Sequence, residues 1–309
     1  MINILFSAGD KHWSQYQAPL IQALDATGLT YVIATEFTPD AVDYIIYAPS
    51  SELQDFTPYT RCKAVLNLWA GVEQVVGNTT LTMPFARMVG GGLTEGMVEW
   101  VTGHVLRHHL GMDAHIVNPD LNWAPDVPPP ASSRKIAILG LGTLGTACGQ
   151  MLNQLGFDVH GWARRPKEVA GITAHHGNDG LTDTLRGAHF VVLLLPATPS
   201  TVCVLDADRL ALLAKGSFVI NPGRGPLIDD DALLSALDNG QLAHATLDVF
   251  RTEPLPKDSP YWSHPNVTVT PHIASETRAD KAAEVIAENV LRGETGKPFL
   301  HLVDRDAGY

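Results

Sequence analysis

A glycine-rich turn between an apolar run and a helix-like segment constrains the fold of this chain most strongly. In KIAILGLGTLGTACGQML, residues 135–152, the glycines follow the pattern G-x-G-x-x-G. The first glycine of such a pattern permits a tight turn, the second lets backbone approach a pyrophosphate, and the third lets the helix pack on the strand. Free amides at the helix start also favour an anion. The stretch predicts dinucleotide binding, although a turn without a ligand would use the same glycines; the expected contacts are Gly140, Gly142, Thr143, Leu144 and Gly145.

Short β-rich runs alternate with helical stretches along the whole chain. Such alternation predicts parallel sheets covered by helices. We therefore expect an α/β protein with two Rossmann-like domains, the first flavodoxin-like and discontinuous, the second a doubly wound dinucleotide-binding domain. The expected strands are NILFS, YVIAT, DYIIYA and AVLNLWA in the first half, then KIAIL, FDVHGW, HFVVLLL, SFVIN, ATLDVF and VTVT.

Helical and proline-rich segments indicate where the domains divide. The segment EGMVEWVTGHVLRHHLGM predicts a long helix, and a linker ending in APDVPPPASSR follows it. The last helical segment, TRADKAAEVIAENVLRGETG, is too short to form a domain and is expected to pack on the first half. We expect a substrate-binding (catalytic) domain at residues 1–99 and 275–309, and a dinucleotide-binding domain at residues 100–274.

Composition argues against several classes of partner. The chain has 33 acidic and 21 basic residues, and this excess of negative charge disfavours nucleic acid and anionic membranes, which are bound through basic patches. No apolar run approaches the roughly 18 residues that span a bilayer, and MINILFSAGD is typical of a first strand rather than a leader. The cysteines, Cys62, Cys148 and Cys203, lack the spacing of a zinc site. We expect a cytoplasmic protein without a metal.

Two arginines follow the second strand of the expected dinucleotide-binding domain. This strand, FDVHGW, leads into Ala163, Arg164 and Arg165, where a carboxylate would otherwise bind an adenosine ribose. A guanidinium can instead bind the ribose 2'-phosphate through two charge-assisted hydrogen bonds. We therefore expect NADPH as the cofactor, with NADH as a weaker alternative. In two competing interpretations, the arginines only face water, or Asp158 within the strand is the missing acid.

Three later strands each lead into a reactive side chain. SFVIN leads to Arg224, ATLDVF to Glu253 and VTVT to His272. The carboxyl ends of parallel strands lie on one edge of a sheet, so these side chains should share a crevice with the cofactor. Each could separately be a surface charge or a packing residue, but together they suit carbonyl reduction. His272 would donate a proton to the oxygen, Glu253 would favour the charged imidazole, and Arg224 would bind a carboxylate and polarise the carbonyl.

Five motifs between residues 135 and 275 occur in the order typical of one family. They are ILGLGTLG, LLLPATPST, NPGRGPLIDDDALLSAL, LDVFRTEPLP and TPHIA. Through them the chain resembles the D-isomer-specific 2-hydroxyacid dehydrogenases. The W-x-R-R strand end, the LNLWAGVE loop and the C-terminal VDRDAGY make it most similar to the bacterial glyoxylate/hydroxypyruvate reductases of the A type.

The resemblance implies roles for individual residues. Arg224 matches the substrate arginine of the family, and Glu253 with His272 matches its acid–histidine pair. Asp248 matches a position near the nicotinamide amide. A loop beside the cofactor is matched by Leu195, Pro196 and Thr198.

A loop of the first domain is implied to hold the substrate carboxylate through the backbone amides of Ala70 and Gly71. Their small size suits a close approach of backbone to a ligand. Trp69 stands where the family more often has glycine, and Glu73 where it more often has aspartate. Trp69 either narrows the pocket to small 2-oxo acids or packs under the loop.

The implied activity is the NADPH-dependent reduction of small 2-oxo acids, glyoxylate to glycolate and hydroxypyruvate to D-glycerate, by a homodimer. A D-2-hydroxyacid dehydrogenase for a bulkier 2-oxo acid, and an NAD(P)-binding regulatory protein like the co-repressors of this fold, are the alternatives. The complete set of Arg224, Glu253 and His272 favours an enzyme.

The predicted long helix carries two further signals. His104 and His108 are four residues apart, a spacing that could bind a metal, but no third ligand is evident and a plain helix face is expected. Trp100 and Val105 belong either to a dimer interface or to a buried helix face within the domain.

Overall fold

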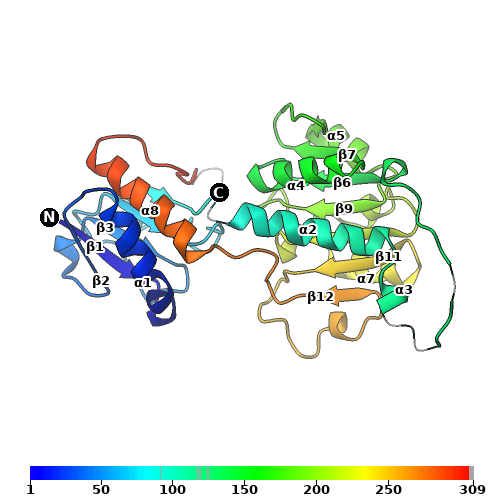
Figure 1. The fold of residues 1–309 in the computed structure, drawn as a ribbon, viewed down its shortest axis with the longest axis horizontal. Coiled ribbons are helices and arrows are strands. Elements are labelled where there is room, and N and C mark those ends of the chain that lie inside the picture. Colours follow the sequence, from blue (N-terminus) through cyan, green and yellow to red (C-terminus); the bar gives the residue numbers. More distant parts are fainter. Residues whose placement is uncertain (91, 117, 119, 124, 306–309) are drawn as a thin grey trace. The chain divides into compact units, whose positions relative to one another are not determined.

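The computed structural model describes residues 1–90, 92–116, 118, 120–123 and 125–305. The chain forms two compact units, one made of Met1–Leu93 and Glu276–Tyr309, the other of Thr94–Ser275 (Figure 1). The boundary expected at residues 99 and 100 lies inside helix α2 (Leu93–His109), and the division follows the start of this helix.

The first unit contains a five-stranded parallel sheet in the order β2-β1-β3-β4-β5, which is the flavodoxin-like strand order. Strand β5 was not among the expected strands, because two residues show no alternation that a pattern could reveal. The strands are β1 (Ile2–Ser7), β2 (Tyr31–Ala34), β3 (Tyr44–Tyr47), β4 (Ala64–Asn67) and β5 (Phe85–Ala86). The helices are α1 (Asp10–Asp25), the short η1 (Pro39–Ala41) and α8 (Ala279–Glu294).

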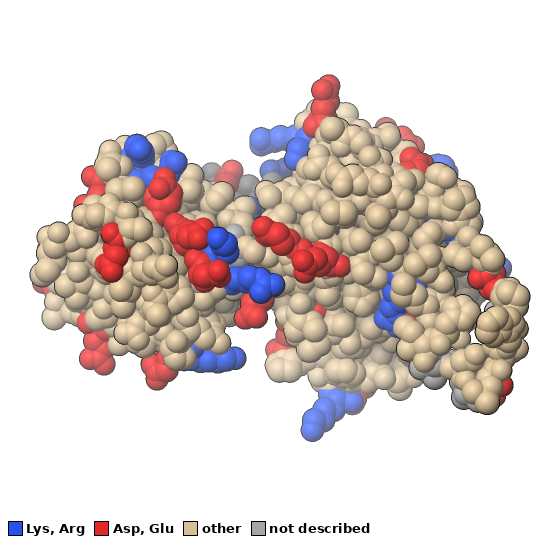
Figure 2. All heavy atoms as spheres, viewed as in Figure 1, with Lys and Arg blue, Asp and Glu red and all other residues tan. Residues whose placement is uncertain are grey.

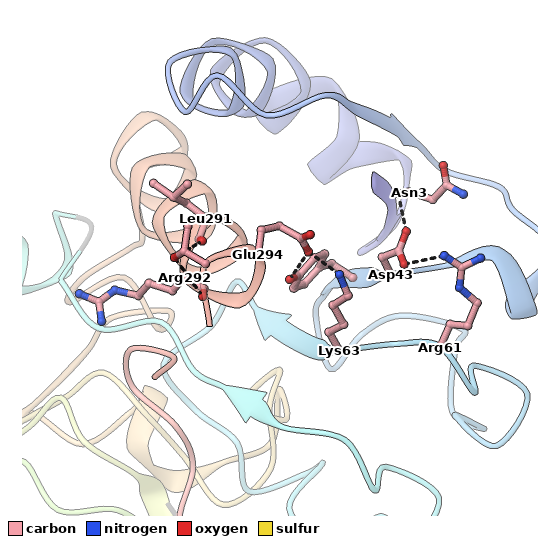
Figure 3. Close-up of polar contacts among 9 residues, drawn as sticks. Asn3, Asp43, Arg61, Lys63, Leu291, Arg292 and Glu294 are labelled. Atoms are coloured by element: carbon pink, nitrogen blue, oxygen red, sulfur yellow. Dashed lines mark hydrogen bonds and ion pairs between the residues drawn. The ribbon is translucent and has the colours of Figure 1, made fainter. Parts of the chain in front are cut away.

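Helix α8 joins the C-terminal part of the chain to the first unit. Its apolar face is buried in the same core as β1, β3 and β4, through Ala282, Ala283, Ile286, Ala287 and Val290. At its last residue, Glu294 Oε1 accepts hydrogen bonds from Tyr44 Oη (2.7 Å) and Lys63 Nζ (2.6 Å) (Figure 3). On the same sheet, Asp43 accepts from Arg61 (2.9 Å) and the backbone of Asn3 (2.9 Å). The first unit is therefore built from both ends of the chain.

The second unit contains a seven-stranded parallel sheet in the order β12-β11-β10-β9-β6-β7-β8. The order reverses at β6, which lies between β7 and β9, as in a doubly wound dinucleotide-binding domain. Strand β8 was not expected: TAHH is a short edge strand that faces solvent on part of its length and lacks an apolar run. The strands are β6 (Lys135–Leu139), β7 (Asp158–Ala163), β8 (Thr173–His176), β9 (Phe190–Leu193), β10 (Ser217–Asn221), β11 (Leu242–Leu247) and β12 (Val267–Val269).

Helices cover both faces of this second sheet, because alternate residues of each buried strand point to opposite faces. Ile136 and Ile138 of β6 pack in one core with α2 and α4, and Ala137 and Leu139 pack in the other with α5, α6 and α7. Besides α2, the helices are α3 (Asp113–Ile116), α4 (Thr143–Gln154), α5 (Gly177–Leu185), α6 (Ala207–Leu210) and α7 (Asp230–Asp238), with short turns η2 (Ala131–Ser133), η3 (Gly225–Leu227) and η4 (Pro260–Trp262).

The packing of helix α2 decides between a dimer interface and a buried helix face for Trp100 and Val105. Val105 is fully buried in the α2–α4 core and Trp100 packs partly against it, so this face of the helix lies inside the unit. No helix among the described residues is both long and apolar enough to cross a bilayer. On the face shown in Figure 2, acidic side chains are scattered over both units, and basic side chains lie in small groups on each unit.

Candidate active site

The glycine loop between β6 and α4 has the shape that a dinucleotide requires. Gly140 has a φ of 109°, a conformation open to glycine, and a side chain there would collide with the backbone of Leu194. A side chain at Gly145 would overlap the carbonyl of Gly140, so this glycine allows α4 to approach the loop. Gly142, at the N-terminus of α4, has open space where a side chain would be. The loop therefore offers backbone amides and room for a pyrophosphate at this helix end.

The carboxyl end of β7 carries the two arginines. Ala163 is the last residue of the strand, and the exposed Arg164 and Arg165 follow it directly. Asp158 is the first residue of β7, at the opposite end, where its carboxylate lies 3.3 Å from His160 Nε2. Asp158 is therefore not placed to bind a ribose beyond the carboxyl end of this strand, which leaves positive charge at that position.

Glu253 and His272 form a direct pair at the carboxyl ends of β11 and β12. His272 Nδ1 lies 2.7 Å from Glu253 Oε2, and Glu253 Oε1 accepts a hydrogen bond from the backbone of Phe250 (2.8 Å). The His272 side chain is 53% exposed and that of Glu253 35%, so a substrate could reach the imidazole. Because Nδ1 bonds to the carboxylate, Nε2 is the nitrogen positioned to give a proton to a substrate.

The backbone of His272 is held in a conformation that side chains rarely adopt, with a φ of 56°. Its amide donates to the carbonyl of Asp248 (2.9 Å). The buried Asp248 carboxylate accepts from Thr270 Oγ1 (2.6 Å) and from the amides of Ile273 and Ala274 (both 2.9 Å). Strain at a reactive residue persists only where the surroundings enforce it. Asp248 enforces it here, and its implied place near the nicotinamide amide stays a prediction.

Arg224 follows β10, the strand next to β11, and lies on a loop held by Asn221. The Asn221 side chain donates to the carbonyl of Arg224 (2.9 Å) and accepts from the amide of Gly223 (3.1 Å). The guanidinium is half-buried and donates to the carbonyl of Gly223 (2.7 Å). The structure therefore puts Arg224 and the Glu253–His272 pair on three adjacent strands, at one edge of the sheet.

The loop expected beside the cofactor follows β9, the strand next to β6. Leu195 packs against the core, and Thr201 fixes the turn: its hydroxyl accepts from the amide of Thr198 (2.8 Å) and donates to the carbonyl of Pro196 (2.6 Å). Since β6 and β9 are neighbours, this loop and the glycine loop leave the sheet at the same edge. Their contacts with a cofactor stay predictions.

Trp69, Ala70 and Gly71 lie in the first unit, after β4. Trp69 is half-buried and packs against the core of that unit, with its ring 6.4 Å from the ring of His12. The buried Asn67 side chain donates to the carbonyls of Trp69 (2.8 Å) and Gly71 (3.2 Å) and so fixes the loop. The packing alternative for Trp69 thus has direct support, and the roles of Ala70 and Gly71 in binding a carboxylate stay predictions.

One protein family and a known relative match most of this chain. Residues 104–274 match the D-isomer specific 2-hydroxyacid dehydrogenase, NAD binding domain. A glyoxylate/hydroxypyruvate reductase A from Serratia proteamaculans is 38% identical over 257 residues, which cover 81% of this chain and 82% of that protein. This chain belongs to the D-isomer specific 2-hydroxyacid dehydrogenases.

Solved structures of this dehydrogenase family have the same fold. A D-isomer specific 2-hydroxyacid dehydrogenase from Xanthobacter autotrophicus, in complex with NADPH and MES, has a TM-score of 0.90 at 37% identity and covers 100% of this chain and 99% of its own. An NADPH-dependent glyoxylate/hydroxypyruvate reductase from Sinorhizobium meliloti, in complex with NADP and sulfate, has a TM-score of 0.89 at 30% identity and covers 100% of both chains.

Three residues that support the dehydrogenase site were missed by sequence reasoning. Lys167 Nζ lies 2.5 Å from the carbonyl of Leu141 and ties the segment after β7 to the glycine loop. The sequence signal for Lys167 was its place as the third basic residue of ARRPK, after the two arginines. Asn67 and Asn221 each end a strand and bond to the loop that follows. An asparagine in that position has a side chain suited to bracing a turn, but the sequence does not show which backbone groups it meets.

His104 and His108 of α2 are packing residues. His108 is buried, its Nε2 lies 2.8 Å from Thr246 Oγ1, and its ring stacks on Phe218 at 4.9 Å. The ring of His104 lies 4.3 Å from that of Trp100. Within the described ranges, no group of three or more His, Cys, Asp or Glu residues could hold a metal ion.

Proposed function

We propose that this dehydrogenase reduces small 2-oxo acids with NADPH, converting glyoxylate to glycolate and hydroxypyruvate to D-glycerate. The observation that carries the proposal is the Glu253–His272 pair, 2.7 Å apart, beside the Arg224 loop. The relative from Serratia proteamaculans bears the name of this activity, and it shares 38% of its aligned residues with this chain.

The side chains act on the substrate as a proton donor, its partner and an anion-binding group. NADPH, when bound, supplies the hydride that reduces the carbonyl carbon. His272 holds a proton at Nε2 and gives it to the carbonyl oxygen. Glu253 bonds to Nδ1 of His272 and orients the imidazole so that Nε2 is available to the substrate. Arg224 binds the substrate carboxylate and stabilises negative charge on the neighbouring oxygen.

Cofactor choice is proposed to depend on the cations after β7. Arg164 and Arg165 are exposed where a ribose 2'-phosphate would lie, and Lys167 is held at the glycine loop. Gly140, Gly142, Thr143, Leu144 and Gly145 would bind the pyrophosphate. The Xanthobacter and Sinorhizobium structures contain NADPH and NADP, which supports NADPH over NADH for this chain.

We also propose that the dehydrogenase is a cytoplasmic homodimer. Several apolar side chains after α2 lie in water, which suits an interface with a second copy. Their exposed fractions are 71% for Ile116, 89% for Leu121, 94% for Trp123 and 86% for Val127. Light scattering should give the mass of two chains, and the mass of one chain would contradict the dimer. Cell fractionation tests the location.

The activity is tested by initial rates of NADPH and NADH consumption with glyoxylate, hydroxypyruvate, pyruvate and phenylpyruvate. We expect fast turnover of the first two with NADPH. A preference for phenylpyruvate would point to a bulkier substrate, and a preference for NADH would overturn the role of the arginines. Absence of turnover with all four acids, despite NADPH binding, would favour the regulatory binding protein.

A further inference from the structure

Two loops of the second unit touch through their backbones. A side chain at Gly225, the residue after Arg224, would overlap the backbone of Phe250 and Arg251. The first loop carries Arg224 and the second carries Glu253. Any shift between these loops would therefore change how the carboxylate-binding guanidinium lies relative to the acid–histidine pair.

The guanidinium of Arg251 joins these two loops to a third loop, the one that follows β9. Arg251 Nη2 donates to the carbonyl of Ile228, at the end of the Arg224 loop, and to Cys203 Sγ (3.2 Å), on the loop that follows β9. Arg251 Nε lies 2.9 Å from Asp230 Oδ2, in the first turn of α7. The planar fork of a guanidinium suits several fixed acceptors at once, which a lysine ammonium cannot match.

The groups that Arg251 contacts are themselves fixed. Asp230 Oδ1 accepts a hydrogen bond from the buried Tyr261 (2.8 Å), whose ring lies 6.0 Å from that of Phe250. The amide of Cys203 donates to the carbonyl of Pro226 (2.9 Å), in the Arg224 loop. Asp230 is the charged partner that Arg251 contacts directly among the described residues. The other acceptors of Arg251, Cys203 Sγ and the Ile228 carbonyl, are neutral.

We propose that Arg251 is a positioning residue for the reduction: it fixes the Glu253 loop against the Arg224 loop and the loop after β9. Its guanidinium bonds to Ile228, Cys203 and Asp230, and we infer that it acts on Glu253 through the backbone between residues 250 and 253. This inference rests on the proposed reductase activity. Loss of Arg251 would impair both substrate binding and proton transfer, while the glycine loop and the cations after β7 would still bind NADPH.

Arg251→Ala should lower kcat/KM for glyoxylate about 10–100-fold, through a lower kcat and a higher KM for the acid, because small misplacements of reacting groups are costly. The dissociation constant for NADPH, measured by fluorescence titration, should stay that of the wild type. Arg251→Lys keeps the charge without the fork, so its kcat/KM should lie between the two. It also provides a folded variant if the alanine variant is unstable.

Arg292→Ala is the matched control, because Arg292 in α8 also bonds to a carboxylate (Glu288, 2.6 Å) and a backbone carbonyl (Pro298, 3.0 Å). It should keep wild-type kcat/KM. Wild-type kinetics in Arg251→Ala or in Arg251→Lys would overturn the inference, as would an equal loss in Arg292→Ala or a loss explained by weaker NADPH binding. If the wild-type protein itself turns over no 2-oxo acid, the proposed function fails first and this inference falls with it.

Discussion

Two histidine sites in the second unit differ in what surrounds the imidazole. His272 is half-exposed at a loop, and its Nδ1 bonds to the carboxylate of Glu253. His108 is buried and His244 is partly buried in the unit, with rings 4.9 Å apart, and each bonds to a threonine hydroxyl at 2.8 Å. Burial, followed by the nearby positive groups, lowers the pKa of His108 to about 3 and that of His244 to about 4.

The comparison shows that residue type alone does not make a proton donor. An imidazole among neutral hydroxyls and aromatic rings is stable only without charge. An imidazole that is open to water and bonds to a carboxylate through Nδ1 presents Nε2 to a substrate for proton transfer. The two sites therefore predict opposite outcomes for substitution: loss of chemistry at one, and loss of stability at the other.

The largest effect should come from His272→Asn. Turnover should fall about 10²–10⁴-fold, because the proposed proton donor is lost. NADPH binding should survive, since the glycine loop is intact. Initial-rate assays measure turnover, and fluorescence titration measures NADPH binding separately. His108→Asn is the comparison variant and should keep the wild-type turnover per folded molecule. Unchanged turnover in His272→Asn would remove the proposed proton donor.

A smaller effect is expected from replacing both Arg164 and Arg165 with Ala. The KM for NADPH should rise about tenfold or more, since each charge-assisted hydrogen bond contributes about 1.5–3 kcal/mol. The KM for NADH should change little, and kcat at saturating NADPH should be kept, because these residues lie away from the histidine. Equal effects on both cofactors would contradict selection through the 2'-phosphate.

His108→Phe should lower the free energy of unfolding by about 1–3 kcal/mol, because it keeps a ring on Phe218 but leaves the buried Thr246 hydroxyl without its partner. The double variant His108→Phe/Thr246→Val removes both polar groups and should recover most of the loss. Denaturant unfolding at neutral pH measures this. A single variant as stable as the wild type would show that the hydrogen bond contributes nothing.

The pH dependence of the free energy of unfolding should also report on His108 and His244. Both histidines have lowered pKa values in the folded chain, so between pH 6.5 and about 4 the unfolded chain binds more protons. The contribution of the two neutral histidines to the free energy of unfolding is complete above pH 6.5. It is lost as the pH falls, by about 1.4 kcal/mol per pH unit for each histidine. His108→Phe removes one of these titrating groups, so the slope should fall by about 1.4 kcal/mol per pH unit. The same slope in both proteins would contradict a neutral buried His108.

Features that depend on only a few neighbouring residues were predicted best from this sequence. The glycine loop could be predicted because Gly140 and Gly145 are needed for one turn and one close approach, both within a few residues. Most strands were found from their apolar runs. Strands β5 and β8 were not, because the first has two residues and the second is a polar edge strand.

The sequence by itself determined the α/β architecture, the strand ends that carry Arg224, Glu253 and His272, and the positive charge after β7. These follow from periodicity and from the rule that parallel strands end on one edge. Only the tertiary structure decided that Glu253 meets His272 Nδ1, that Asp248 braces the histidine backbone, that Arg251 joins three loops, and that His108 is buried. Each of these contacts joins residues far apart in the chain, and their distances depend on strand pairing and packing that no local pattern encodes.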